Sequence, residues 1–177
     1  TKGFKCSWEV GGANTDETFK GIINNLPLGL NSSYSGTVSI KKVGTGLWRL
    51  TGANSYSGTT QVAGGTLIVN GTHSGTGAVT VMSGATLKGM GKIAGKVTLS
   101  SGATVEGGDT LVNGKGLVFS STLTLSNGST VNMPVSLTKC NTITLNGAAT
   151  IGETAVLNIT VSEDGLARAP YADTEYQ

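Results

Sequence analysis

Gly64-Gly65-Thr66-Leu67 is a short phrase that returns four more times along the chain, each time after a β-branched run. The further copies are Gly84-Ala85-Thr86-Leu87, Gly102-Ala103-Thr104-Val105, Gly128-Ser129-Thr130-Val131 and Gly147-Ala148-Ala149-Thr150-Ile151. The apolar residues that close the copies, at positions 67, 87, 105, 131 and 151, lie 20, 18, 26 and 20 residues apart. Such a period is too short for a propeller blade or a helical-hairpin repeat and fits one turn of a β-solenoid.

A second apolar marker lies five or six residues ahead of the residue that closes each phrase. These residues are Val62, Val81, Leu99, Leu125 and Leu145. Around them apolar residues alternate with threonine, as in Val79-Thr80-Val81, which is typical of a strand with one buried face. When coils of such strands stack about 4.8 Å apart, like residues form ladders down a narrow core. We therefore predict an all-β fold, a single-stranded parallel β-helix (β-solenoid), in which the five markers face one interior and a glycine corner follows each. It should be right-handed, because parallel crossovers within one sheet are.

The repeats suggest one β-helix domain over residues 1–177. Within it we expect N-terminal coils or a cap at 1–42, the clearest repeat at 43–71, further coils at 72–162, and a C-terminal cap or tail at 163–177. A β-helix ends in unpaired strand edges, which charged or proline-containing segments can block. Because the C-terminal tail has this character, we predict a monomer.

Composition restricts the class of protein and its partners. Glycine accounts for 28 of 177 residues and only 12% are charged, yet the hydrophobic fraction is 37% and periodic, which excludes a disordered linker. No stretch is long and apolar enough for a membrane span, and a dispersed net charge of +2 argues against nucleic acid as a partner. Lys41-Lys42, the only basic doublet, is interpreted as two solvated charges at a strand end. Without a signal peptide or an initiator methionine, the sequence is expected to be a mature segment or a fragment of a longer protein.

The two cysteines, Cys6 and Cys140, are 134 residues apart. In a solenoid of about 20-residue coils, this spacing separates them by roughly six coils, too far for a disulfide. We predict two separate, buried thiols. Neither a CxxC motif nor a histidine pair is present, so no metal site is expected.

Residues 43–71 carry a specific family pattern. It comprises Gly44-Thr45-Gly46, an alternating strand, Leu50-Thr51-Gly52-Ala53-Asn54, Tyr56, Ser57-Gly58, Thr59-Thr60 and Gly65-Thr66-Leu67. The stretch resembles the passenger-associated transport repeat, also called the autotransporter-associated β-strand repeat, and residues 74–108 look like the sequence that commonly follows it. The resemblance implies a right-handed parallel β-helix, secreted or on the surface of a Gram-negative bacterium. The translocating barrel of an autotransporter is then expected either outside this segment or replaced by another export route.

Several residues of this repeat have expected positions. Gly52 and Asn54 are expected at a corner, because both tolerate the left-handed conformation. Trp48 and Leu50 alternate with Leu47, Arg49 and Thr51, so Trp48 should pack in the core rather than serve as a sugar platform. Tyr56 should pack at a corner, with a carbohydrate-facing ring as the alternative.

The predicted stacking shows which residues of neighbouring coils would lie together, so it can be used to look for an active site. Polysaccharide lyases and hydrolases need carboxylates gathered on one face. The position after each phrase places Lys88 beside Glu106, which predicts a surface ion pair. Asp109 has no acidic counterpart in neighbouring coils, and His73, the only histidine, is interpreted as a solvated loop residue. We predict no catalytic, cofactor-binding or metal-binding residues.

Three functional interpretations remain open. We favour a non-enzymatic structural stalk or passenger segment of a secreted or cell-surface protein. The alternatives are an adhesin module that binds a cell-surface glycan or a host protein, and a polysaccharide lyase or hydrolase. Exposed aromatic residues would favour the second interpretation, and acidic residues converging in a groove would favour the third.

Overall fold

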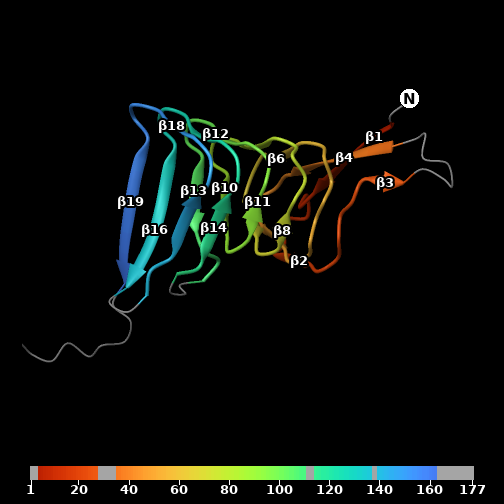
Figure 1. The fold of residues 1–177 in the computed structure, drawn as a ribbon. Coiled ribbons are helices and arrows are strands. Elements are labelled where there is room, and N and C mark those ends of the chain that lie inside the picture. Colours follow the sequence, from red (N-terminus) through yellow and green to blue (C-terminus); the bar gives the residue numbers. More distant parts are fainter. Residues whose placement is uncertain (1–3, 28–34, 111–113, 137–138, 163–177) are drawn as a thin grey trace, which may run out of the picture.

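The computed structural model describes residues 4–27, 35–110, 114–136 and 139–162, and every regular element in them is a β-strand. The strands lie side by side along one axis, from β1 and β4 at one end to β19 at the other (Figure 1). Nearly all of them pair in parallel with strands of neighbouring coils, so the predicted parallel β-helix is confirmed. Within the described part of the chain, no helix is long and apolar enough to cross a lipid bilayer.

The strands form three sheets, here called A, B and C. Sheet A contains β1 (Phe4–Val10), β4 (Ser35–Lys42), β6 (Thr60–Val62), β9 (Val79–Val81), β12 (Val97–Leu99), β15 (Leu123–Leu125) and β18 (Ala149–Ile151), with β3 (Leu26–Pro27) antiparallel to β4. Sheet B contains β2 (Glu17–Phe19), β5 (Leu47–Leu50), β7 (Thr66–Val69), β10 (Thr86–Gly89), β13 (Thr104–Gly107), β16 (Thr130–Ser136) and β19 (Val156–Ser162). Sheet C contains β8 (Thr72–His73), β11 (Lys92–Ile93), β14 (Gly116–Phe119) and β17 (Thr142–Leu145).

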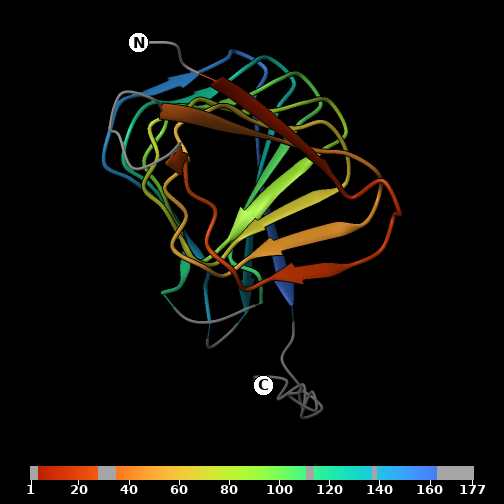
Figure 2. The same cartoon turned by 90° about the vertical axis from the view of Figure 1, so that its right-hand side faces the viewer.

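From β8 onward the chain visits sheets C, A and B once per coil, so the sheets enclose the core seen end-on in Figure 2. In sheet A the predicted markers stack in register as Val62, Val81, Leu99 and Leu125. All four are buried, because the β-branched and leucine side chains alternate inward while the threonines between them face outward. In sheet B, Leu67, Leu87, Val105 and Val131 form the matching ladder.

The prediction for the last coil was wrong. Leu145 lies in sheet C and pairs with Phe119, and Ile151 takes the expected place next to Leu125 in sheet A. The sheet B ladder continues from Val131 to Leu157 instead of Ile151. The physical reason is coil length: both ladders advance 26 residues in this coil, in which β16 and β17 are longer than β10 and β11. The phrase at residues 147–151 is compatible with a corner before a strand of sheet A as well as before a strand of sheet B, so it does not distinguish the two positions.

Two kinds of glycine corner occur. The glycine of the repeated phrase turns the chain in the left-handed region, with φ of +76° at Gly84 and +74° at Gly102. Gly52 and Asn54 lie between β5 and β6, at a corner as predicted, but neither has a positive φ, so the predicted left-handed conformation was wrong. Gly52 is needed for space, since a Cβ there would lie 2.1 Å from the carbonyl oxygen of Gly21. Asn54 is buried, and its Oδ1 accepts the Ile23 N–H at 2.9 Å.

Trp48 and Tyr56 are both interior residues, as predicted. Trp48 is 8% exposed and its ring lies 6.1 Å from that of Phe19. Tyr56 is 1% exposed, and its hydroxyl shares a 2.7 Å hydrogen bond with the hydroxyl of Thr60. Neither ring is available to stack on a sugar.

The two ends of the described solenoid expose apolar side chains. At the N-terminal end, β1 and β2 pair with β4 and β5 as strands of a coil, and Phe4 and Trp8 are exposed. At the other end the exposed residues are Ile151, Val156, Leu157, Ile159 and Val161. The C-terminal cap or tail predicted at 163–177 lies outside the described residues.

Candidate functional site

The most connected polar cluster centres on Asp109, which follows β13. Its Oδ2 accepts from Arg49 Nε at 2.8 Å and from Asn70 Nδ2 at 2.9 Å, and its Oδ1 accepts from Arg49 Nη2 at 3.2 Å. Arg49 lies on β5 and Asn70 follows β7, so one carboxylate connects three coils. The hydrogen bonds from Arg49 hold the pKa of Asp109 below its usual value. A carboxylate that stays ionised can link coils through hydrogen bonds and ion pairs. It is poorly suited to donating a proton.

The Asp109 cluster was not predicted. Asp109 has no acidic partner in the described residues around it, as expected, but its basic partner is 60 residues away in sequence. The chain reaches Arg49 by turning back after β13, where Gly108 has a φ of +87° and forms an antiparallel bridge with Gly89. The predicted surface pair of Lys88 and Glu106 is confirmed at 3.3 Å.

The basic doublet splits between the two faces of β4. Lys41 faces solvent and its Nζ lies 2.9 Å from Glu9 Oε2. Lys42 is fully buried, so its interpretation as a solvated charge was wrong. Strand alternation turns its side chain inward, where Nζ donates to the carbonyl oxygens of Val43 at 2.6 Å, Gly64 at 3.2 Å and Gly44 at 3.3 Å. Burial lowers the pKa of Lys42.

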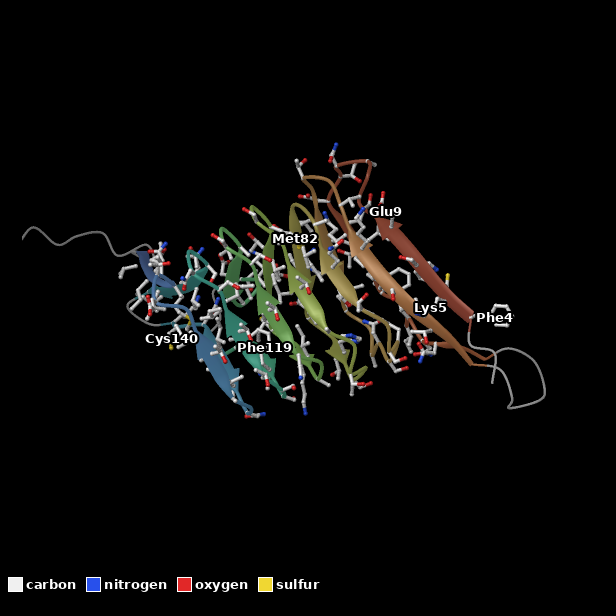
Figure 3. The ribbon with its side chains drawn as sticks, turned by 90° about the horizontal axis from the view of Figure 1, so that it is seen from above. Phe4, Lys5, Glu9, Met82, Phe119 and Cys140 are labelled. Carbon is white, nitrogen blue, oxygen red and sulfur yellow. The ribbon has the colours of Figure 1, made fainter. Side chains whose placement is uncertain are left out.

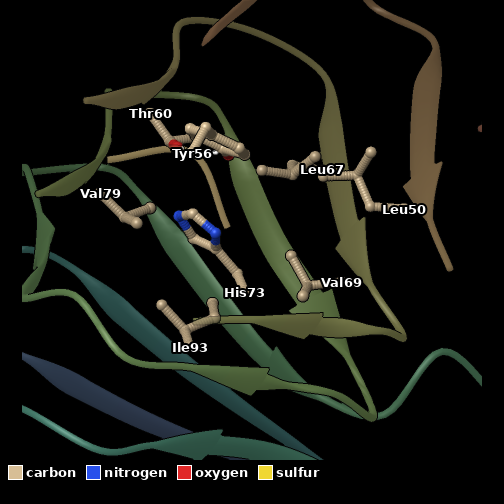
Figure 4. A pocket seen from close by; sticks show the side chains of 8 residues that line it. All are labelled: Leu50, Tyr56, Thr60, Leu67, Val69, His73, Val79 and Ile93. Atoms are coloured by element: carbon tan, nitrogen blue, oxygen red, sulfur yellow. Dashed lines mark hydrogen bonds between the residues drawn. The ribbon is translucent and has the colours of Figure 1, made fainter. Parts of the chain in front are cut away.

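His73 is also a buried residue, which corrects its interpretation as a solvated loop histidine. It lies on β8, is 3% exposed, and stacks on Tyr56 with ring centroids 4.2 Å apart. Figure 4 shows its ring beside a small internal cavity, whose volume of about 10 Å³ leaves room for roughly one water. Neither ring nitrogen has a hydrogen-bond partner. Burial lowers the pKa of His73, and the backbone of Asn54 opposes this effect.

The cysteines lie toward opposite ends of the molecule. Figure 3 shows Cys140 far along the solenoid from Phe4 and Lys5, the neighbours of Cys6. The prediction of two thiols without a disulfide is confirmed. Their predicted burial was wrong, since Cys6 is half-buried and Cys140 is exposed.

The outer face of sheet A carries a polar groove of about 330 Å³ near the N-terminal end. Ser39, Gln61 and Thr80 lie along it, and its one charged residue, Lys41, already pairs with Glu9. No carboxylate lines the groove. Among the described residues, no group of three or more His, Cys, Asp or Glu side chains is placed to hold a metal ion.

Comparison with known proteins adds the family of the clearest repeat. The model of the passenger-associated-transport-repeat family matches residues 40–69. These residues are a passenger-associated transport repeat. Over 64 residues the chain is 44% identical to the adhesin BmaC autotransporter of Brucella suis biovar 1 (strain 1330), a stretch that covers 36% of this chain and 2% of that adhesin. No solved structure matches the chain.

These findings confirm the family resemblance at the repeat. They indicate a passenger segment that is secreted or lies on the surface of a Gram-negative bacterium. The family-model match ends at Val69, and the ladders continue into the coils after it.

Proposed function

We propose that residues 1–177 act as one non-enzymatic, structural β-helix segment of a surface passenger. The observation that carries this proposal is the pair of unbroken ladders in sheets A and B, whose side chains fill the interior from Val62 to Leu125 and from Leu67 to Val131. The polar clusters support it as well, because each joins strands of different coils. Parallel stacking of this kind gives an extended, rigid spacer.

Proteolysis of the purified chain tests the structural role. The expected result is an intact β-helix core at trypsin concentrations that digest a Leu99→Ala variant, since strands locked in sheets expose few lysine and arginine sites. Rapid digestion of both proteins would overturn the proposal. Incubation with a panel of polysaccharides should release neither reducing ends nor unsaturated products, and release of either would establish an enzyme instead.

An adhesin role is the second candidate, supported by the name of the Brucella relative and by the polar groove on sheet A. A cell-surface glycan or a host protein is the proposed partner. Binding of the purified chain to a glycan array and to host cells distinguishes the two roles. Saturable binding that is lost in a Gln61→Ala, Thr80→Ala double variant would favour the adhesin, and binding no stronger than that of an unrelated protein would favour the spacer.

A further inference from the structure

His73 combines features that a stable core residue does not need. It is the one histidine of the chain and is almost fully buried. Both of its ring nitrogens are unpartnered beside an internal cavity. A neutral imidazole buried without hydrogen bonds already carries a desolvation cost, and a charged one carries far more.

Apart from the backbone of Asn54, the surroundings of the ring offer little to stabilise a positive charge. Besides His73, the cavity is lined by Leu50, Tyr56, Thr60, Leu67, Val69, Val79 and Ile93, which come from β5, the corner after it, β6, β7, β9 and β11 (Figure 4). Tyr56 is the one titratable group among them, and burial raises its pKa to about 12, so it stays neutral. The charged residues on the packed elements are Lys92 of β11, which is exposed while Ile93 is buried, and Arg49 of β5, which pairs with Asp109.

The strand that carries His73 is also weakly held. β8 has two residues and pairs with β11 over two positions. On its other side it meets Asn54 through a single bridge, with Asn54 N–H donating to Thr72 O at 2.7 Å and Ser74 N–H donating to Asn54 O at 2.9 Å. Few hydrogen bonds therefore need to break for this part of the coil to open.

We propose that His73 is a proton-operated switch: when its second ring nitrogen takes a proton from solvent, β8 separates from its neighbours and exposes the corner at Tyr56. The proton is lost again when the pH rises, and the coil closes. An opened, solvated imidazole has a pKa near 6.5. Because burial lowers the pKa of the closed state, the open state binds more protons, so the closed state is stable above about pH 6.5 and loses stability as the pH falls below it. One such group changes the opening equilibrium by up to about tenfold per pH unit.

NMR and hydrogen exchange test the switch directly in the intact chain. With one histidine, a single imidazole signal reports the protonation of His73. We expect this signal to remain that of a neutral ring at pH 6, where a solvated histidine is mostly charged. Amide protection factors at Asn54, Ser74 and Ala94, whose N–H groups hold β8 to its neighbours, should fall up to tenfold per pH unit between about pH 6.5 and 5.

Two variants separate the switch from general loss of stability. His73→Phe keeps an apolar ring and should abolish the pH dependence of protection in this window. Ile93→Val trims a wall of the same cavity, so it should lower protection at every pH but keep the wild-type slope. An imidazole signal that titrates at an ordinary pKa, or an equal slope in His73→Phe and the wild type, would overturn the proposal. If His73→Phe does not fold, the wild-type NMR titration still decides.

Discussion

Truncation of a ladder residue measures how much the stacked core contributes. Leu99 on β12 is fully buried between Val81 and Leu125, its partners in the coils on either side. Leu99→Ala removes three carbon atoms, which at about 0.8 kcal/mol each amounts to roughly 2.4 kcal/mol of lost burial. The gap left behind adds a cavity cost, because neighbours held in register on two sides relax little. We expect a total loss of about 2 to 5 kcal/mol in the free energy of unfolding.

Leu157→Ala is the matched control. Leu157 ends the ladder of sheet B and is 64% exposed, so the same truncation should cost about 0.5 kcal/mol or less. Lys88→Ala breaks only a surface ion pair and should also cost about 0.5 kcal/mol or less. Urea titrations followed by far-UV circular dichroism give the three values. A cost for Leu157→Ala equal to or above that for Leu99→Ala would refute the idea that stacking on both sides determines the contribution of a ladder residue.

Asp109→Asn should lower the free energy of unfolding by about 1 to 2 kcal/mol at pH 7 in urea titrations, because the pair with Arg49 loses its negative charge. Since the pKa of Asp109 is lowered, this difference should shrink as the pH falls below about 4, and a constant difference down to pH 2 would contradict the assignment. Gly52→Ala should cost more than about 1 kcal/mol, because its Cβ meets a carbonyl oxygen, whereas Gly12→Ala, which has open space, should be near neutral on thermal unfolding. Deletion of residues 163–177 should raise the mass measured by light scattering, because we expect this charged, proline-containing segment to prevent a second chain from pairing with the exposed apolar edge at β19; an unchanged mass would show that the tail does not guard it.

The ladders were predictable because a solenoid repeats one local rule. Each coil needs an inward apolar residue at the same place. Their regular spacing and their alternation with polar residues therefore identify Val62, Val81 and Leu99 in the sequence. The phase of the last coil was not predictable in this way. Leu145 and Ile151 sit in equally strand-like contexts, and only the pairing with Phe119 or with Leu125 determines which sheet each one joins.

The polar residues of the interior were missed for a different reason. Residue type suggested solvent for Lys42 and His73, although register places Lys42 beside Val62 and His73 beside Ile93. Extending the sheet A ladder by one coil toward the N-terminus would therefore have placed Lys42 inside. His73 lies in sheet C, for which no ladder was predicted. For Asp109 no such signal exists, because its contact with Arg49 depends on the chain turning back across coils after β13.

Lys42 and His73 are both buried, titratable residues, but they affect the stability of their coils in opposite ways. The Lys42 ammonium replaces its lost water with three carbonyl oxygens, so its charge is compatible with the closed core. Neither ring nitrogen of His73 has a hydrogen-bond partner, so only the backbone of Asn54 offsets the cost of a charge there. In a solenoid each coil is stabilised by its immediate neighbours, and a weak coil therefore lowers stability locally instead of throughout the chain. An acid-opened β8 would then divide the solenoid at one point while the ladders from Leu87 onward and the coils around Lys42 stay closed.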